Sequence, residues 1–148
     1  AGHQLGNHSW SHQRMLFMSL DEINREIEGT DQQIRAAGYQ GEILFRPPYG
    51  KKLVVLPWFL AKTHRTSITW DIAPETFDED SEDPQTMAAQ VLEQVRPGSI
   101  VLLHLMYKNR DASRAALPLI IKGLKQKGYK MVRVSDLLAA EKLAAVEH

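Results

Sequence analysis

The sequence predicts an α/β fold built on a parallel sheet. Short apolar or β-branched runs alternate with longer amphipathic segments, and this strand–helix order occurs four times along the chain. One run, SIVLL at 99–103, is almost wholly apolar, which is typical of a strand buried on both faces. Repeated strand–helix units of this kind form either a barrel or an open parallel sheet.

The first helix is predicted to begin at Ser19. Ser19 and Glu22 have the spacing of a capping box, in which each residue satisfies a free backbone N–H at the helix start. Three isoleucines then lie on one stripe of the helix: Ile23, Ile27 and Ile34. Gly38 is expected to end the helix.

The remaining elements are predicted from the same signals. Strands are expected at four places: 42–45, 66–70, 99–103 and 129–134. Helices are expected at about 52–62, from Pro84 onward with Asp83 as N-cap, at about 113–127, and from Ser135 as N-cap to the end. The loop at 73–83 carries six acidic residues, and a solvated surface is its default interpretation.

Composition favours one globular domain and excludes several function classes. The chain has 148 residues, 43% apolar and 24% charged, and 18 Lys and Arg residues balance 18 Asp and Glu residues. This balance does not support a nucleic-acid partner, and no apolar run is long enough for a membrane span. Because there is no cysteine, any metal would be held by His, Asp or Glu.

Polar residues follow the predicted strands at their carboxyl ends. They are His8 and His12 in the opening loop, after a strand that is expected to be lost or frayed, then Arg46, Tyr49, Trp70, Asp71 and His104. The carboxyl ends of parallel strands converge on the ligand site in such folds. These residues are therefore predicted to form a catalytic pocket.

Each of these residues also has a purely structural interpretation. On one helical turn, His8 and His12 would have Cβ atoms about 5–6 Å apart, so they could share a metal or simply decorate a surface. His104 could be a core histidine, and Arg46 and Tyr49 could serve only the RPPYG turn. Two further histidines, His3 and His64, are expected to have no role in the site.

The ordered motifs resemble those of one family. HSWSH (8–12) resembles the H-[ST]-x-x-H metal motif of the polysaccharide deacetylases, the NodB-homology domain of carbohydrate esterase family four. RPPYG (46–50) resembles the R-x-P-Y-G turn of that family, and GSIVLLH (98–104) resembles its L-x-H motif. The segment 117–138 is similar to the terminal helix–strand–helix of the family, so the resemblance covers nearly the whole chain.

This resemblance implies a distorted, incomplete (β/α) barrel that hydrolyses N-acetyl groups of amino sugars in chitin, peptidoglycan or related glycans. The family metal, usually zinc, is held by one Asp and two His, which correspond here to His8 and His12. His104 corresponds to the general acid that protonates the leaving amine. The other implied roles are an oxyanion contact from the N–H of Tyr49, an acetyl pocket lined by Leu102, orientation of the catalytic carboxylate by Arg46, and a substrate contact at Trp70.

The residue types suit this chemistry. A metal polarises the amide carbonyl and lowers the pKa of bound water towards about 7, and neutral imidazoles hold zinc while leaving positions open. A separate imidazole that donates a proton to nitrogen contributes roughly 10²–10⁴-fold.

The chain departs from the family pattern in two motifs. The T-F-D-D motif, which supplies the base and the third metal ligand, is absent and would lie before Ala1. In the fourth motif, D-x-x-D-W, Ala73 and Thr76 replace the aspartates and Phe77 replaces the tryptophan. The carboxylate partner of the acid histidine is therefore open, with Asp71 or Glu75 as substitutes.

These departures predict that 1–148 is the C-terminal portion of a single deacetylase domain, lacking its first βα units and weakly active alone. Its open sheet edge would be covered by the missing segment or by a second copy. The alternatives are a related hydrolase of formyl or cyclic amides, a glycan-binding domain without catalysis, and an α/β domain with an unrelated pocket. The compartment is open, although a glycan substrate favours an extracytoplasmic site.

Overall fold

A computed structural model of the chain describes residues 2–75 and 83–146. For residues 144–146 it describes the backbone alone. The described elements are, in chain order, β1 (Gly6–Asn7), α1 (Leu20–Ala36), β2 (Leu44–Phe45), the short 3₁₀ helix η1 (Pro48–Gly50), α2 (Val55–Lys62), α3 (Pro84–Gln94), α4 (Asp111–Gln126) and α5 (Val134–Val146). They belong to two compact units, the first formed by Ala1–Thr69 with Arg133–His148 and the second by Trp70–Val132.

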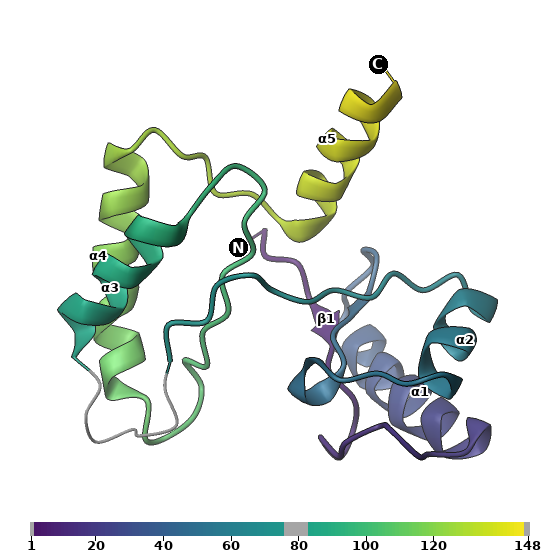
Figure 1. The fold of residues 1–148 in the computed structure, drawn as a ribbon. Coiled ribbons are helices and arrows are strands. Elements are labelled where there is room, and N and C mark those ends of the chain that lie inside the picture. The colour runs from purple at the N-terminus through teal and green to yellow at the C-terminus, as the bar shows by residue number, and fades with distance from the viewer. Residues whose placement is uncertain (1, 76–82, 147–148) are drawn as a thin grey trace. The chain divides into compact units, whose positions relative to one another are not determined.

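The first unit has parallel strands covered by α1 and α2 (Figure 1). β1 pairs with β2 in parallel, with Gly6 opposite Leu44, and Phe45 forms a further parallel bridge with Ser67. The core between these elements consists of Met15, Ile23, Ile27, Phe45, Leu56, Phe59 and Leu60. The parallel order brings the ends of β1 and β2, and so His8 and Arg46, to one edge of the strand pair.

The capping box at the start of α1 is confirmed. The side chain of Ser19 accepts a hydrogen bond from the backbone N–H of Glu22, and the carboxylate of Glu22 accepts one from the backbone N–H of Ser19 at 2.8 Å. Ile23 and Ile27 are fully buried. Gly38 follows the helix with φ of +89°, a conformation that glycine adopts without strain.

The second unit is a helix pair, α3 and α4, which lie side by side (Figure 1). Asp83 caps α3 by accepting from the N–H of Thr86 at 2.7 Å, as predicted. The shared core consists of Ile72, Met87, Ala88, Val91, Ala116, Ile120 and Leu124. A Cβ atom at Gly123 would lie 2.4 Å from Leu92, so the absence of a side chain there allows the close approach of the helices. Ile72 and Val101 form a parallel bridge beside the pair.

Several predicted strands are shorter than expected, and one prediction is wrong. The strands predicted at 66–70 and 99–103 have single bridges, at Ser67 and Val101. The strand predicted at 129–134 is not formed: Met131 and Val132 are each 46% exposed, so the run lacks the buried face of a paired strand.

Two other boundaries differ from prediction. α5 begins at Val134, so Ser135 is inside the helix rather than its N-cap, and its backbone N–H donates to the side chain of Gln4 at 3.0 Å. The strand before His8, expected to be lost or frayed, is present as the short β1. Across the described ranges, no helix is long and apolar enough to cross a bilayer.

Candidate active site

The two histidines of HSWSH approach each other directly. The Nε2 atoms of His8 and His12 lie 3.2 Å apart, and the ring centroids lie 4.8 Å apart. The segment is not the helical turn considered from the spacing, because Ser9 and His12 have φ of +67° and +57°. The predicted proximity of the two histidines is therefore confirmed, and it is produced by the left-handed backbone at Ser9 and His12.

The orientation of His8 is set by its other ring nitrogen. Nδ1 lies 2.6 Å from the carbonyl oxygen of Arg46. Because a carbonyl can only accept a hydrogen bond, Nδ1 carries the proton in this contact, and in the neutral ring Nε2 then presents a lone pair. Metal-binding histidines commonly have this arrangement, in which the distal nitrogen donates to a backbone carbonyl.

The pair fits two ligand positions of a zinc ion. Zn–N distances of about 2.0–2.1 Å in tetrahedral geometry place two ligand nitrogens roughly 3.3 Å apart. The observed separation of 3.2 Å between the Nε2 atoms of His8 and His12 is close to that value. Within residues 2–75 and 83–146, no cluster of three or more His, Asp or Glu side chains could hold a metal, so the pair alone would supply two ligands.

The buried carboxamide of Asn7 anchors the start of the loop. Asn7 is 1% exposed, and its Nδ2 donates to the carbonyl of Ile27 at 2.8 Å and to Asp31 at 2.6 Å. Its Oδ1 accepts from the backbone N–H of Ser9 at 2.9 Å. The Ser9 hydroxyl in turn accepts from the backbone N–H of His12 at 3.0 Å. A continuous set of hydrogen bonds therefore runs from α1 to His12.

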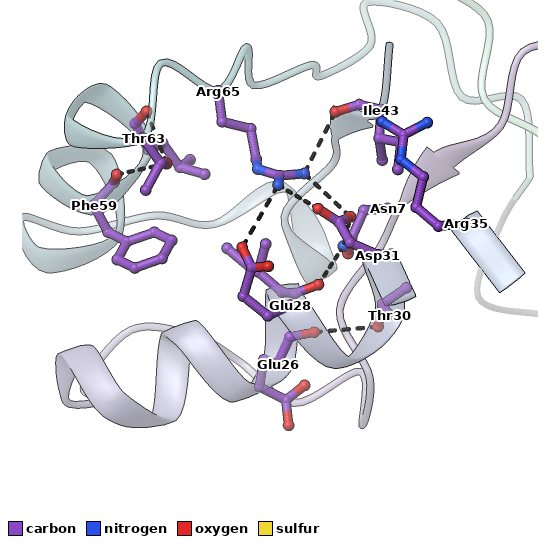
Figure 2. Close-up of polar contacts among 12 residues, drawn as sticks. Asn7, Glu26, Glu28, Thr30, Asp31, Arg35, Ile43, Phe59, Thr63 and Arg65 are labelled. Atoms are coloured by element: carbon purple, nitrogen blue, oxygen red, sulfur yellow. Dashed lines mark hydrogen bonds and ion pairs between the residues drawn. The ribbon is translucent and has the colours of Figure 1, made fainter. Parts of the chain in front are cut away.

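An ion pair holds Asp31 in place for this contact (Figure 2). The guanidinium of Arg65 contacts both carboxylate oxygens of Asp31: Nη1 donates to Oδ1 at 3.2 Å, and Nη2 makes a closer contact with Oδ2. Both side chains are shielded, with 14% and 13% exposed area, and Arg65 also approaches Glu28 at 3.9 Å and the carbonyl of Ile43 at 3.4 Å. The fork fixes one carboxylate oxygen of Asp31 for Asn7.

A second clamp comes from Glu26, five residues before Asp31 on α1. Its Oε2 accepts from the backbone N–H groups of Trp10 and Ser11 at 3.0 and 2.8 Å. Its Oε1 accepts from the hydroxyl of Ser11 at 2.8 Å. Trp10 lies over Gly29, where an added Cβ would be 3.5 Å from the indole. The middle of the loop is thus fixed to α1.

The RPPYG turn follows β2 and lies beside the histidines. The N–H of Arg46 donates to the carbonyl of Asn7 at 2.9 Å, and Pro47 and Pro48 are fully buried. Tyr49 has φ of +60°, which is costly for a residue with a Cβ. Its half-exposed ring lies 5.1 Å from the His12 ring, measured between centroids. The predicted neighbourhood of Tyr49 and the histidine pair is observed.

The second unit holds the predicted acid, His104, against a carboxylate. Nδ1 of His104 contacts Oε2 of Glu75 closely, and the backbone N–H of His104 donates to Oε1 at 2.7 Å. The hydroxyl of Ser113, on α4, donates to the same Oε1 at 2.7 Å. Of the two substitutes considered from the sequence, the structure selects Glu75, because Asp71 accepts instead from Ile100 N–H and the Ser99 hydroxyl.

The protonation state of Glu75 follows from these contacts. Burial raises the pKa of its carboxyl, but the hydrogen bonds from the His104 N–H, the Ser113 hydroxyl and the His104 ring outweigh burial and leave the pKa below its usual value. Glu75 is thus an anion next to Nδ1 of His104, a partner that favours the ring tautomer with a proton on that nitrogen.

The other predicted site residues are placed as follows. Leu102 is buried, with its N–H donating to the carbonyl of Ile72 at 2.8 Å, and Trp70 is half-buried in the same unit. Thr76 and Phe77, of the degenerate fourth motif, lie outside the described residues. His3 and His64, expected to have no role, are exposed. The supporting residues Asn7, Glu26, Asp31, Arg65 and Ser113 were not predicted from the sequence. For Asn7 there was a usable signal, because it stands directly between a strand and the histidine motif.

Comparison with known proteins identifies the family. Residues 1–67 match the polysaccharide deacetylase family. The peptidoglycan-N-acetylmuramic acid deacetylase PdaC of Bacillus subtilis is 32% identical over 142 residues, which cover 95% of this chain and 28% of PdaC. The solved PdaC structure superposes with a TM-score of 0.78 and 32% identity, over 99% of this chain and 68% of that chain.

Two other solved structures are similar. A family 4 acetyl xylan esterase from Clostridium thermocellum, in complex with a cobalt ion, has a TM-score of 0.84 at 31% identity, over 95% of this chain and 66% of that chain. A CE4 family pseudoenzyme from Bacillus anthracis has a TM-score of 0.78 at 29% identity, over 91% of this chain and 46% of that chain. The chain belongs to the polysaccharide deacetylase family. It spans about half the length, or less, of the curated relatives that it matches.

Removing the Asn7 anchor should destabilise the first unit. Asn7→Ala leaves the Ser9 N–H and one Asp31 oxygen without their buried partner, and each such loss costs about 1–3 kcal/mol. We expect the free energy of unfolding in urea to fall by about 2 kcal/mol or more. Gln32→Ala, which removes an exposed carboxamide from α1, is the matched control and should change little. Equal effects of the two substitutions would contradict the anchor.

The contribution of Glu75 to stability should depend on pH. Because its pKa is lowered in the folded state, ionised Glu75 stabilises the fold above the usual glutamate pKa of about 4.3, and this contribution is lost as the pH falls through the lowered folded-state value. Urea unfolding of Glu75→Gln should therefore differ most from wild type near neutral pH and least in acid. Glu93→Gln, at an exposed position on α3, should show no such trend. A difference that grows on acidification would refute this assignment.

Proposed function

We propose that the protein containing this chain is a metal-dependent hydrolase that removes N-acetyl groups from amino sugars of a polysaccharide. One observation carries the proposal: the Nε2 atoms of His8 and His12 meet at 3.2 Å while Nδ1 of His8 faces a backbone carbonyl. Two neutral imidazoles arranged in this way suit a divalent metal, and zinc is the ion favoured by their spacing.

The proposed roles separate metal binding from proton transfer. His8 and His12 hold the metal, which when bound polarises the amide carbonyl and acidifies water. The backbone N–H of Tyr49 donates to the oxygen that gains charge as the amide is attacked. His104 delivers a proton from Nε2 to the leaving amine, while Glu75 keeps Nδ1 protonated.

Three further roles are proposed from the family resemblance. Leu102 lines the acetyl pocket, Trp70 contacts the sugar, and Arg46 orients the catalytic carboxylate. That carboxylate and the third metal ligand would be aspartates outside the residues described. We infer that they belong to the same domain, a distorted (β/α) barrel of which this chain forms the C-terminal portion.

Peptidoglycan is the polysaccharide that the relatives favour. PdaC and PdaA of Bacillus subtilis are peptidoglycan-N-acetylmuramic acid deacetylases, and relatives in Bacillus cereus and Listeria monocytogenes are peptidoglycan-N-acetylglucosamine deacetylases. A cell-wall substrate would place the protein outside the cytoplasm. A chitin-like glycan, or a formyl or cyclic amide, is the alternative that substrate comparison separates.

A glycan-binding protein without catalysis is the second candidate. It is favoured by the degenerate fourth motif, in which Ala73 takes an aspartate position, and by the similarity to the Bacillus anthracis pseudoenzyme. Glu75 argues against it, because a carboxylate still engages the acid histidine.

Acetate release by the whole protein tests the proposal. With zinc supplied, purified peptidoglycan fragments and chitin oligomers should both be assayed, and we expect deacetylation of at least one. His104→Gln should lower kcat by about 10²–10⁴-fold through loss of the acid. His64→Gln, an exposed histidine in the first unit, is the control and should retain activity. Metal binding without acetate release from any substrate would favour the non-catalytic candidate.

A further inference from the structure

We infer that Ser113 is a positioning residue for His104, and that it acts by fixing the carboxylate of Glu75 so that His104 keeps its proton on Nδ1. The inference rests on the proposed role of His104 as the proton donor. Ser113 lies at the start of α4, and neither its place in the sequence nor any motif marks it as part of a site.

The side-chain hydroxyl of Ser113 is unusual because it lies in a buried part of a helix. It is fully buried, and Asn7 is the other polar residue that is buried in the described part of the chain. A serine in a helix gains little from helix propensity, and a buried hydroxyl is costly unless it is hydrogen-bonded. The Ser113 hydroxyl meets this requirement by donating to Oε1 of Glu75 at 2.7 Å.

The hydroxyl matters because Glu75 makes two different contacts with one histidine. Oε1 accepts a hydrogen bond from the backbone N–H of His104, and Oε2 contacts Nδ1 of its ring. For both contacts to exist together, the carboxylate must keep one rotation about its final bond, a torsion that is intrinsically broad. Ser113 adds a third point of attachment at Oε1 and so removes that freedom.

The consequence for His104 is a defined tautomer. A carboxylate at Nδ1 selects the ring form with the proton on that nitrogen, and Nε2 is then the atom that gains and loses the catalytic proton. A carboxylate free to rotate would bind the backbone N–H alone for part of the time and release Nδ1. Ser113 is thus expected to control catalysis without touching substrate.

Among the described residues, an aromatic ring also lies next to His104, and an arginine of α4 holds the segment that follows it. Tyr107 lies with its ring centroid 5.9 Å from that of His104. Arg114, next to Ser113 on α4, donates to the carbonyls of Leu105 and Tyr107 and pairs with Asp111. These contacts hold the segment that follows His104, and within the described part of the chain Glu75 is a carboxylate in contact with its ring.

The test uses ¹⁵N-labelled whole protein and reads the tautomer of His104 from long-range ¹H–¹⁵N correlation spectra. Wild type should show neutral His104 with the proton on Nδ1. Ser113→Ala should increase the population with the proton on Nε2 and lower kcat about tenfold with little change in KM, because the acid is misplaced rather than removed. Ser113→Cys, similar in size but a weak donor, should shift the tautomer in the same direction and covers the case in which the alanine variant folds poorly.

Ser99→Ala is the matched control, since the Ser99 hydroxyl donates to the carboxylate of Asp71 at 2.8 Å in the same unit. It should leave the tautomer of His104 unchanged. An unchanged His104 tautomer in folded Ser113→Ala and Ser113→Cys, or an Nε2–H form in wild type, would overturn the inference. Because the spectra need no substrate, this outcome is separate from failure of the proposed deacetylase activity.

Discussion

The site depends on how the backbone of residues 8–12 satisfies its hydrogen bonds. This segment leaves the sheet after Asn7, so its N–H groups need partners other than strand or helix neighbours. Glu26 of α1 accepts hydrogen bonds from two of these N–H groups. The carboxamide of Asn7 accepts from a third, and Asp31 of α1 holds that carboxamide in place. The position of His8 and His12 is therefore a consequence of how α1 docks on the strands.

Both units orient a histidine by occupying Nδ1 with an oxygen, and the kind of oxygen differs. His8 faces a neutral backbone carbonyl, whereas His104 faces the carboxylate of Glu75. A neutral acceptor suits an imidazole that must stay neutral to bind a metal, whereas an anionic acceptor stabilises an imidazole that carries a positive charge. The proposed division of labour between ligand and acid thus follows from the second partner of each ring.

Features encoded by adjacent residues could be predicted from the sequence, and those set by docking could not. The helix starts at Ser19 and Asp83 are confirmed because a cap involves only the next three residues. The predicted strands were longer than those observed, and the strand predicted at 129–134 was wrong. A strand forms only where the segment has both a pairing partner and a buried face. The histidine pair was visible from its spacing. Asn7 and Ser113 were missed because the groups that give them their role, on α1 for Asn7 and at Glu75 for Ser113, lie 20 or more residues away in the sequence.

The most direct test of this account is the metal affinity of His12→Gln in the whole protein, measured by chelator competition with zinc and by the absorption spectrum of the cobalt form. The account predicts one tightly bound ion in wild type, a loss of affinity of tenfold or more in His12→Gln, and no change in His3→Gln, an exposed histidine of the same unit. Equal affinity in wild type and His12→Gln would contradict the assignment of His8 and His12 as joint ligands.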